Sequence, residues 1–300
     1  MTPRVPWTPI DVIQLLFAWI VALILGQLAY EVLVPPKVEG QHEVVQGNKT
    51  LVVKFLPGNR YNGETDNGTF RFAGEYPAQD RHTLILSPDK SDAIRTVTFK
   101  GTERDRVGLI TINIIFVQCS AIVLIAVLLL KYRTKWGAAF GNSKDRFWAV
   151  SLAFTFGVGF LLPAYGLHSI SHILIISLGG EPTTQEAVKM VSISSSQTEL
   201  ILQAFSVVIL APIAEELFFR GVIYTSIKQA GLPNLAIGFS AIFFAAIHGS
   251  WALMLPLIVL SLILVWIYER TGSIIAPIVM HTTFNAVNFA MIKCLPPLTN

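Results

Sequence analysis

The chain alternates between long apolar runs and short polar segments. A helix needs about 20 mostly apolar residues to cross the hydrocarbon core of a membrane. The apolar runs are Ile10–Val34, Val107–Leu130, Phe147 to about Leu167, Leu200–Ile227, the shorter Leu235–Gly249, Trp251–Tyr268 and Ser273–Ile292. The stretch His168–Leu178 either extends the third run or lies at the membrane interface. The pattern predicts an all-α polytopic membrane helix bundle with about seven transmembrane helices.

A more polar segment with a different residue pattern, residues 37–106, separates the first two apolar runs. Its short runs are rich in β-branched and aromatic residues, for example Thr50–Phe55 and Ile94–Phe99, and pairs such as Asn62-Gly63 interrupt them. This pattern predicts a small β-rich insertion between the first two helices. The expected division of the chain is 1–36 (first transmembrane helix), 37–106 (β-rich insertion), 107–146 (second helix with a polar loop) and 147–300 (main membrane domain).

Composition agrees with a membrane protein, because 53% of the residues are hydrophobic and only 14% are charged, against roughly 25% charged in soluble domains. The net charge of +3 gives no reason to expect nucleic-acid binding. Basic residues concentrate in the loop after the second helix, at Lys131, Arg133, Lys135, Lys144 and Arg146. Cytoplasmic loops carry this excess. We therefore expect an integral protein of the cell (inner) membrane, with the N-terminus cytoplasmic and residues 37–106 extracytoplasmic.

Ionisable and amide side chains interrupt three of the apolar runs. They are Glu215, Glu216 and Arg220 in the fourth run, His248 in the fifth, and His281 and Asn285 in the seventh. Each ionisable group in a span costs roughly 2.5–3.5 kcal/mol on insertion scales, so such groups usually mark function. Counted from the expected cytoplasmic ends at about 1.5 Å per residue, four of them come to nearly one depth: Glu215, His248, His281 and Asn285.

Helical spacing predicts how these side chains are arranged. Glu216 and Arg220 are four residues apart and share a helix face, so we expect an ion pair. Glu215 is rotated from Glu216 by about 100° and points elsewhere. His281 and Asn285 are also four apart and face one side together. Pro212, one turn before Glu215, removes a backbone hydrogen bond and favours a local opening of the helix.

Three pieces of sequence carry a resemblance to a known family. Glu215-Glu216-x-x-x-Arg220, Phe244-x-x-x-His248 and His281-x-x-x-Asn285, in this order on apolar helices, resemble the signature motifs of the CPBP family. That family includes the type II CAAX prenyl endopeptidases and bacterial relatives linked to bacteriocin processing and immunity (Abi-like proteins). The resemblance covers roughly residues 147–292 and leaves the insertion unassigned.

The resemblance implies an intramembrane endopeptidase, with Glu215 and His248 activating a water and His281 and Asn285 stabilising the tetrahedral oxyanion. Glu216, Arg220 and Phe244 would support these residues. No cofactor is required in this reading. The family has also been described as metalloproteases, and a divalent metal such as zinc, held by Glu215, His248 and His281, is the alternative.

Two other classes of function remain open at the sequence level. One is a non-proteolytic membrane scaffold or bacteriocin-immunity-type protein. The other is a proton-coupled transporter with Glu215, His248 and His281 as the relay, although no inverted repeat is evident in the sequence. The expected partners are membrane lipid and a membrane protein or peptide substrate, which the resemblance extends to CAAX-type proteins. The sequence gives no indication of the oligomeric state.

Overall fold

The computed structural model describes residues 3–33, 106–182, 185–193 and 196–294, together with the backbone of strands between residues 41 and 100. The chain divides into two units. One comprises Met1–Ala29 with Ile110–Asn300, and the other comprises Tyr30–Leu109.

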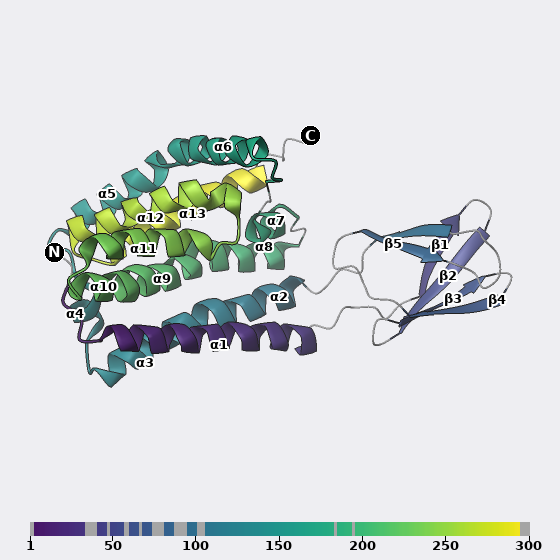
Figure 1. Cartoon of the computed structure of the whole chain (residues 1–300), viewed down its shortest axis with the longest axis horizontal. Coiled ribbons are helices and arrows are strands. Elements are labelled where there is room, and N and C mark those ends of the chain that lie inside the picture. The colour runs from purple at the N-terminus through teal and green to yellow at the C-terminus, as the bar shows by residue number, and fades with distance from the viewer. Residues whose placement is uncertain are drawn as a thin grey trace. The chain divides into compact units, whose positions relative to one another are not determined.

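All the regular secondary structure in the described residues of the first unit is helical (Figure 1). Its first part contains α1 (Pro9–Leu33), α2 (Arg106–Asn113), η1 (Ile114–Cys119), α3 (Ser120–Lys131), α4 (Trp136–Phe140), α5 (Arg146–Gly159), α6 (Leu161–Ser177) and α7 (Glu186–Ile193). Its second part contains α8 (Gln197–Ala204), η2 (Phe205–Leu210), α9 (Ala211–Glu216), η3 (Leu217–Tyr224), α10 (Thr225–Gln229), α11 (Pro233–Ala246), α12 (Trp251–Thr271) and α13 (Ile275–Cys294).

Among the described residues, six helical stretches are long and apolar enough to cross a membrane. They are Pro9–Tyr30, Arg106–Lys131, Arg146–Ser177, Gln197–Gln229, Trp251–Thr271 and Ile275–Cys294. The expected short fifth span corresponds to Pro233–Ala246, which is apolar but below spanning length. The stretch left open at His168–Leu178 continues the third span as α6, after a break at Phe160. The structure therefore supports a polytopic helix bundle, and the total of about seven spans stays a prediction.

The backbone of the second unit contains six strands: β1 (Gln41–Gln46), β2 (Lys49–Leu56), β3 (Arg60–Thr65), β4 (Gly68–Ala73), β5 (Arg81–Leu86) and β6 (Arg95–Lys100). The first four form an antiparallel sheet in chain order, and β5 pairs with β6. The side chains of these strands lie outside the described residues. A folded β-rich insertion with its own core therefore stays a prediction.

Local sequence explains where several helices begin and end. Asp145 caps α5, because its carboxylate accepts a hydrogen bond from the Trp148 amide at 2.9 Å. Ser196 caps α8 in the same way through the Glu199 amide. Gly272 ends α12 in the left-handed conformation that glycine adopts without strain.

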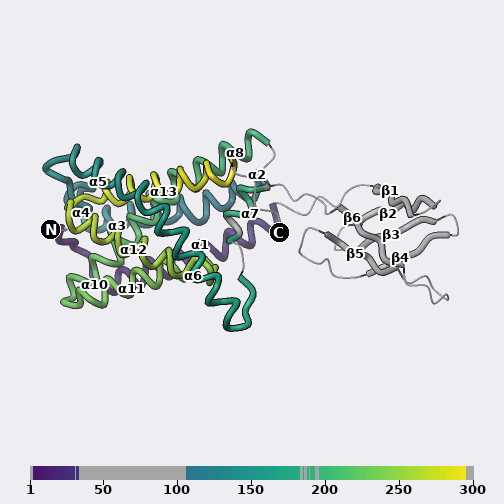
Figure 2. The backbone as a smooth tube through the Cα atoms, turned by 90° about the horizontal axis from the view of Figure 1, so that it is seen from above, coloured from purple at the N-terminus to yellow at the C-terminus, as the bar shows by residue number. Residues whose placement is uncertain are grey.

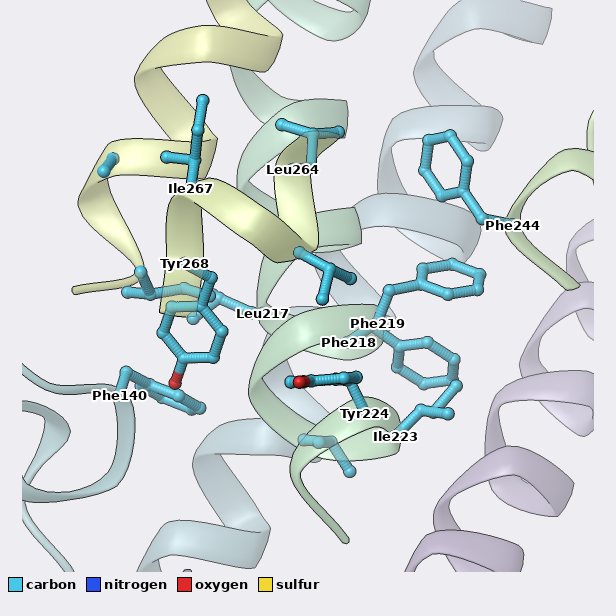
Figure 3. Packing of buried hydrophobic residues seen from close by; sticks show 14 of the residues in the cluster. Phe140, Leu217, Phe218, Phe219, Ile223, Tyr224, Phe244, Leu264, Ile267 and Tyr268 are labelled. Carbon is cyan, nitrogen blue, oxygen red and sulfur yellow. The ribbon is translucent and has the colours of Figure 1, made fainter. Parts of the chain in front are cut away.

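The buried core lies where η3 packs between α4, α11 and α12 (Figure 3). Phe218, Phe219 and Tyr224 are almost fully buried there, as are Phe140 of α4 and Phe244 of α11. The rings of Phe219 and Phe244 meet edge to face, with centroids 5.2 Å apart. Around this core α13 packs along α5, and α12 packs against both α11 and α6, as Figure 2 shows. The segments that carry or adjoin the unusual polar residues are thereby held together: α9 with Glu215 and Glu216, η3 with Arg220, the end of α11 before His248, and α13 with His281 and Asn285.

Candidate functional site

The continuous helix Gln197–Gln229 changes its hydrogen-bond pattern around the paired glutamates. The six-residue α9, which carries Glu215 and Glu216, lies between the π-helical segments η2 and η3. A π-helix bonds each amide to the carbonyl five residues earlier and is frequent at functional sites. The wider turn changes the direction of successive side chains relative to a regular α-helix.

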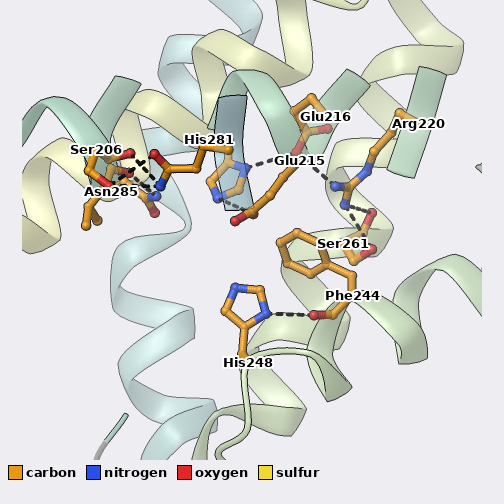
Figure 4. Close-up of polar contacts among 11 residues, drawn as sticks. Ser206, Glu215, Glu216, Arg220, Phe244, His248, Ser261, His281 and Asn285 are labelled. Carbon is orange, nitrogen blue, oxygen red and sulfur yellow. Dashed lines mark hydrogen bonds and ion pairs between the residues drawn. The ribbon is translucent and has the colours of Figure 1, made fainter. Parts of the chain in front are cut away.

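Glu216 lies at the centre of a buried polar network (Figure 4). Its Oε1 atom accepts from Arg220 Nη1 at 2.8 Å, which confirms the expected ion pair, and both side chains are fully buried. The same oxygen lies 2.9 Å from His281 Nδ1. Arg220 Nη2 donates to Ser261 Oγ at 2.9 Å, and the guanidinium lies 4.7 Å from the Phe244 ring centroid. The pair is thus fixed by contacts from α11, α12 and α13.

Glu215 points away from this pair, as the helical rotation predicts. Its Oε2 atom lies 3.8 Å from His281 Nε2, while the side chain as a whole retains 25% exposure. Oε2 is itself inaccessible and makes no hydrogen bond within the described part of the chain. His281 therefore stands between two carboxylates, with one nitrogen hydrogen-bonded to Glu216 and the other facing Glu215.

His248 follows the last turn of α11 and is oriented by its own helix. Its Nδ1 lies 2.7 Å from the carbonyl oxygen of Phe244, and its ring lies 4.8 Å from the Phe244 ring. A carbonyl only accepts, so Nδ1 carries the hydrogen and Nε2 of the neutral ring has a lone pair. Figure 4 shows the His248 ring turned toward the side chains of Glu215 and His281.

Asn285 lies one turn beyond His281 on α13 and contacts η2. Its Nδ2 atom donates to the carbonyl oxygen of Val207 at 2.9 Å. Nearby, Gln118 Nε2 donates to Ser206 Oγ at 2.8 Å. The structure thus brings Glu215 and His281 together, turns His248 toward them, and ties the Asn285 amide to the backbone of the glutamate-bearing helix. The catalytic roles of these residues stay predictions.

The predicted metal alternative was Glu215, His248 and His281. Within the described residues, no three His, Cys, Asp or Glu side chains form a group that could hold a metal ion. As placed, Glu215, His248 and His281 are therefore not such a group. Each ring would still offer Nε2, because Nδ1 of His281 faces Glu216 and Nδ1 of His248 faces a carbonyl, an orientation that metal-bound histidines also adopt. Metal dependence stays a prediction, and we assign no step to a metal.

Sequence reasoning missed Ser261, Ser206 and Gln118, which hold the site from neighbouring helices. A serine in an apolar helix carries little signal, because its hydroxyl commonly bonds to its own backbone. Gln118 is a stronger signal, since a buried amide in a membrane helix needs a partner.

The described fold and apolar helices define an integral, polytopic membrane protein. Residues 197–287 match the family model described as Rce1-like, type II CAAX prenyl endopeptidase Rce1-like. This segment contains all three motifs and confirms the resemblance drawn from them.

One curated relative gives a further comparison. The chain is 33% identical over 101 residues to the UPF0177 protein YxdF of Lactococcus lactis subsp. lactis (strain IL1403). The matched region is 33% of this chain and 55% of that protein, so the chain spans about half of the relative's length. No solved structure matches the chain.

Proposed function

We propose that the protein is an intramembrane endopeptidase that hydrolyses peptide bonds of membrane-embedded or lipid-anchored proteins, including CAAX-type substrates. The observation that carries the proposal is Glu215, a partly exposed carboxylate inside a span. Its Oε2 faces His281 at 3.8 Å and has no hydrogen-bond partner among the residues that the structure describes. A buried acceptor left unpaired is costly. Such a residue in a span indicates function. The match of residues 197–287 to an endopeptidase family supports the same conclusion.

In this proposal Glu215 is the general base and His248 orients the water. The carboxylate takes one proton from the water while His248 Nε2 accepts a hydrogen bond from the other. The water oxygen then attacks the carbonyl carbon, and its electrons move onto the carbonyl oxygen. When the C–N bond breaks, the leaving nitrogen takes the proton from Glu215, which restores the carboxylate.

His281 and Asn285 are proposed to bind the oxyanion. Because Glu216 Oε1 already accepts from Arg220 Nη1 and carries no hydrogen, His281 Nδ1 must donate to it. His281 can then donate to the oxyanion through Nε2 only when both ring nitrogens carry hydrogen. The Asn285 amide has a second hydrogen beyond the one given to Val207, and preorganised donors of this kind stabilise oxyanions strongly in a dry site.

We also propose a cytoplasmic N-terminus, a cytoplasmic loop at residues 131–146 and an extracytoplasmic, β-rich insertion at residues 37–106 in the cell membrane. The support is the concentration of basic residues in that loop. The proposed partners are membrane lipid and a membrane protein or peptide substrate, and no cofactor enters the proposal.

The test compares peptide ends in host membranes that contain either the wild type or Glu215→Gln at equal abundance. Glu181→Gln is the matched control, because it makes the same change at an exposed position outside the spans. We expect new peptide ends with the wild type and Glu181→Gln and none with Glu215→Gln, measured by mass spectrometry. Identical peptide pools from all three membranes, with the protein folded, would favour the non-proteolytic scaffold instead.

A further inference from the structure

The π-helical segment η2 leaves the backbone carbonyl of Val207 without its usual hydrogen-bond donor. At its end, the Ala211 amide donates to the carbonyl of Ser206, five residues earlier, and not to that of Val207, four residues earlier. If this pattern continued by one residue, the amide of residue 212 would donate to the Val207 carbonyl. Residue 212 is proline, which has no amide hydrogen.

The Val207 carbonyl thereby loses both of its ordinary intrahelical donors. A backbone carbonyl within a membrane helix needs a partner, because no water is available there to replace one. Asn285 of α13 supplies it, since its Nδ2 donates to Val207 O at 2.9 Å. The carbonyl has no hydrogen to give, so the nitrogen end of the Asn285 amide is directed to η2.

This bond determines the orientation of an amide that stands one turn from His281. An Asn amide carries two hydrogens at a fixed angle, so binding one of them sets the direction of the other. The bond also joins α13 to the helix that carries Glu215 and Glu216. A proline three residues before Glu215 is therefore connected to the side chain expected to bind the oxyanion.

We propose that Pro212 is a positioning residue: by lacking an amide hydrogen it leaves the Val207 carbonyl to Asn285 and so fixes the direction of the Asn285 amide beside His281. The consequence for catalysis rests on the proposed function. The consequence for the orientation of Asn285 does not, and the two are measured separately.

The orientation is measured by NMR on the full chain in nanodiscs, with ¹⁵N-labelled asparagine and with Asn285 assigned by its loss in Asn285→Gln. Pro212→Ala adds the competing amide hydrogen. Its control is Pro212→lactic acid, introduced by nonsense suppression. Lactic acid has the same methyl side chain as alanine, but an ester oxygen replaces the backbone N–H. We expect the two Asn285 side-chain protons to differ clearly in shift in the wild type and in the lactic acid variant. In Pro212→Ala this difference should shrink and the protons should exchange faster.

The catalytic consequence is measured with a fluorescence-quenched peptide that spans the cleavage site found in the membrane experiment. Complete removal of an oxyanion donor lowers kcat by roughly 10²–10³-fold. A misdirected donor should cost less, so we expect kcat of Pro212→Ala to be about 10- to 100-fold below that of Pro212→lactic acid, with KM unchanged.

The outcomes separate the two proposals. Equal Asn285 shifts in Pro212→Ala and the wild type would overturn the positioning role. Equal and measurable kcat values in Pro212→Ala and Pro212→lactic acid would overturn its consequence for catalysis. If no form of the protein cleaves peptides while the Asn285 protons still respond to the added amide, the endopeptidase is overturned and Pro212 still orients Asn285.

Discussion

At the scale of single residues, two adjacent glutamates of one helix have opposite environments. Glu216 is fully buried and its Oε1 is bonded to Arg220 and His281, whereas Glu215 retains 25% exposure and its Oε2 faces His281 at 3.8 Å. Within the described residues, Oε2 of either glutamate has no hydrogen-bond partner. The first arrangement is suited to holding the site together and the second to reacting. The same substitution at the two positions should therefore affect different properties.

We expect Glu216→Gln to lower the free energy of unfolding by about 3–5 kcal/mol, because it leaves the buried Arg220 charge without its counter-ion. Glu215→Gln should change it by less than about 1 kcal/mol, because it removes no hydrogen bond made by Oε2. Denaturant unfolding of both variants in the same detergent measures the difference. Equal destabilisation by the two substitutions would contradict this division of roles.

The residue scale also shows how far the sequence could predict the site. The pairing of Glu216 with Arg220 follows from a spacing of four, because that spacing holds in any helix. The partner of Asn285 could not be predicted, because it is the backbone carbonyl of Val207. Every residue has such a carbonyl, so the sequence does not distinguish this one. That carbonyl is free because η2 is π-helical and residue 212 is proline, and a shift from four to five residues in the bonding pattern leaves no mark in apolar periodicity.

At the scale of elements, the packing of η3 against α4 depends on a glycine, Gly221, which has no side chain. A Cβ added to Gly221 would lie 2.6 Å from Cε1 of Phe140, whose ring is buried in the core. The five-residue α4 therefore lies close to the helix that bears the site. Sequence reasoning gave α4 no role, because such a short helix in a basic loop has too few residues to show a period.

We expect Gly221→Ala to destabilise the protein by about 1–3 kcal/mol, since the buried Phe140 ring cannot move without disturbing its neighbours. The matched control is Gly238→Ala in α11, where an added Cβ would meet nothing within 4 Å. That change should be neutral or stabilising by up to about 1 kcal/mol, because alanine favours helix more than glycine does. The comparison is made by thermal unfolding. Similar Tm shifts for both variants would show that the Phe140 ring can move to accommodate a Cβ at position 221.

At the scale of the whole membrane unit, the first two spans belong to the environment of the site. The motif resemblance begins near residue 147, yet Trp19 Nε1 donates to Val117 O at 3.0 Å and its ring lies 4.8 Å from that of Phe218 on η3. Gln118 in η1 bonds to Ser206 in η2, beside the carbonyl that binds Asn285. The family match covers residues 197–287, whereas these contacts come from the first two spans, which lie outside it.

The Gln118–Ser206 bond should therefore be a measurable link between the second and fourth spans. Single substitutions Gln118→Leu and Ser206→Ala and the double variant form a cycle, which isolates the energy of the pair. Hydrogen bonds between membrane helices contribute about 0.6 kcal/mol on average and at most about 2 kcal/mol. Because both side chains are buried and bond at 2.8 Å, we expect a coupling of about 1 kcal/mol or more in reversible unfolding in bicelles.

The same variants can also be examined by NMR of Asn285, because Ser206 immediately precedes Val207, whose carbonyl binds Asn285. If the second span holds η2 in place, Gln118→Leu should also shift the Asn285 side-chain protons, although Gln118 belongs to none of the three motifs and lies on another span. A coupling near zero together with unshifted Asn285 protons would mean that the motif-bearing helices maintain the site alone. A coupling with shifted protons would make the second span a structural part of the site that no motif in the sequence marks.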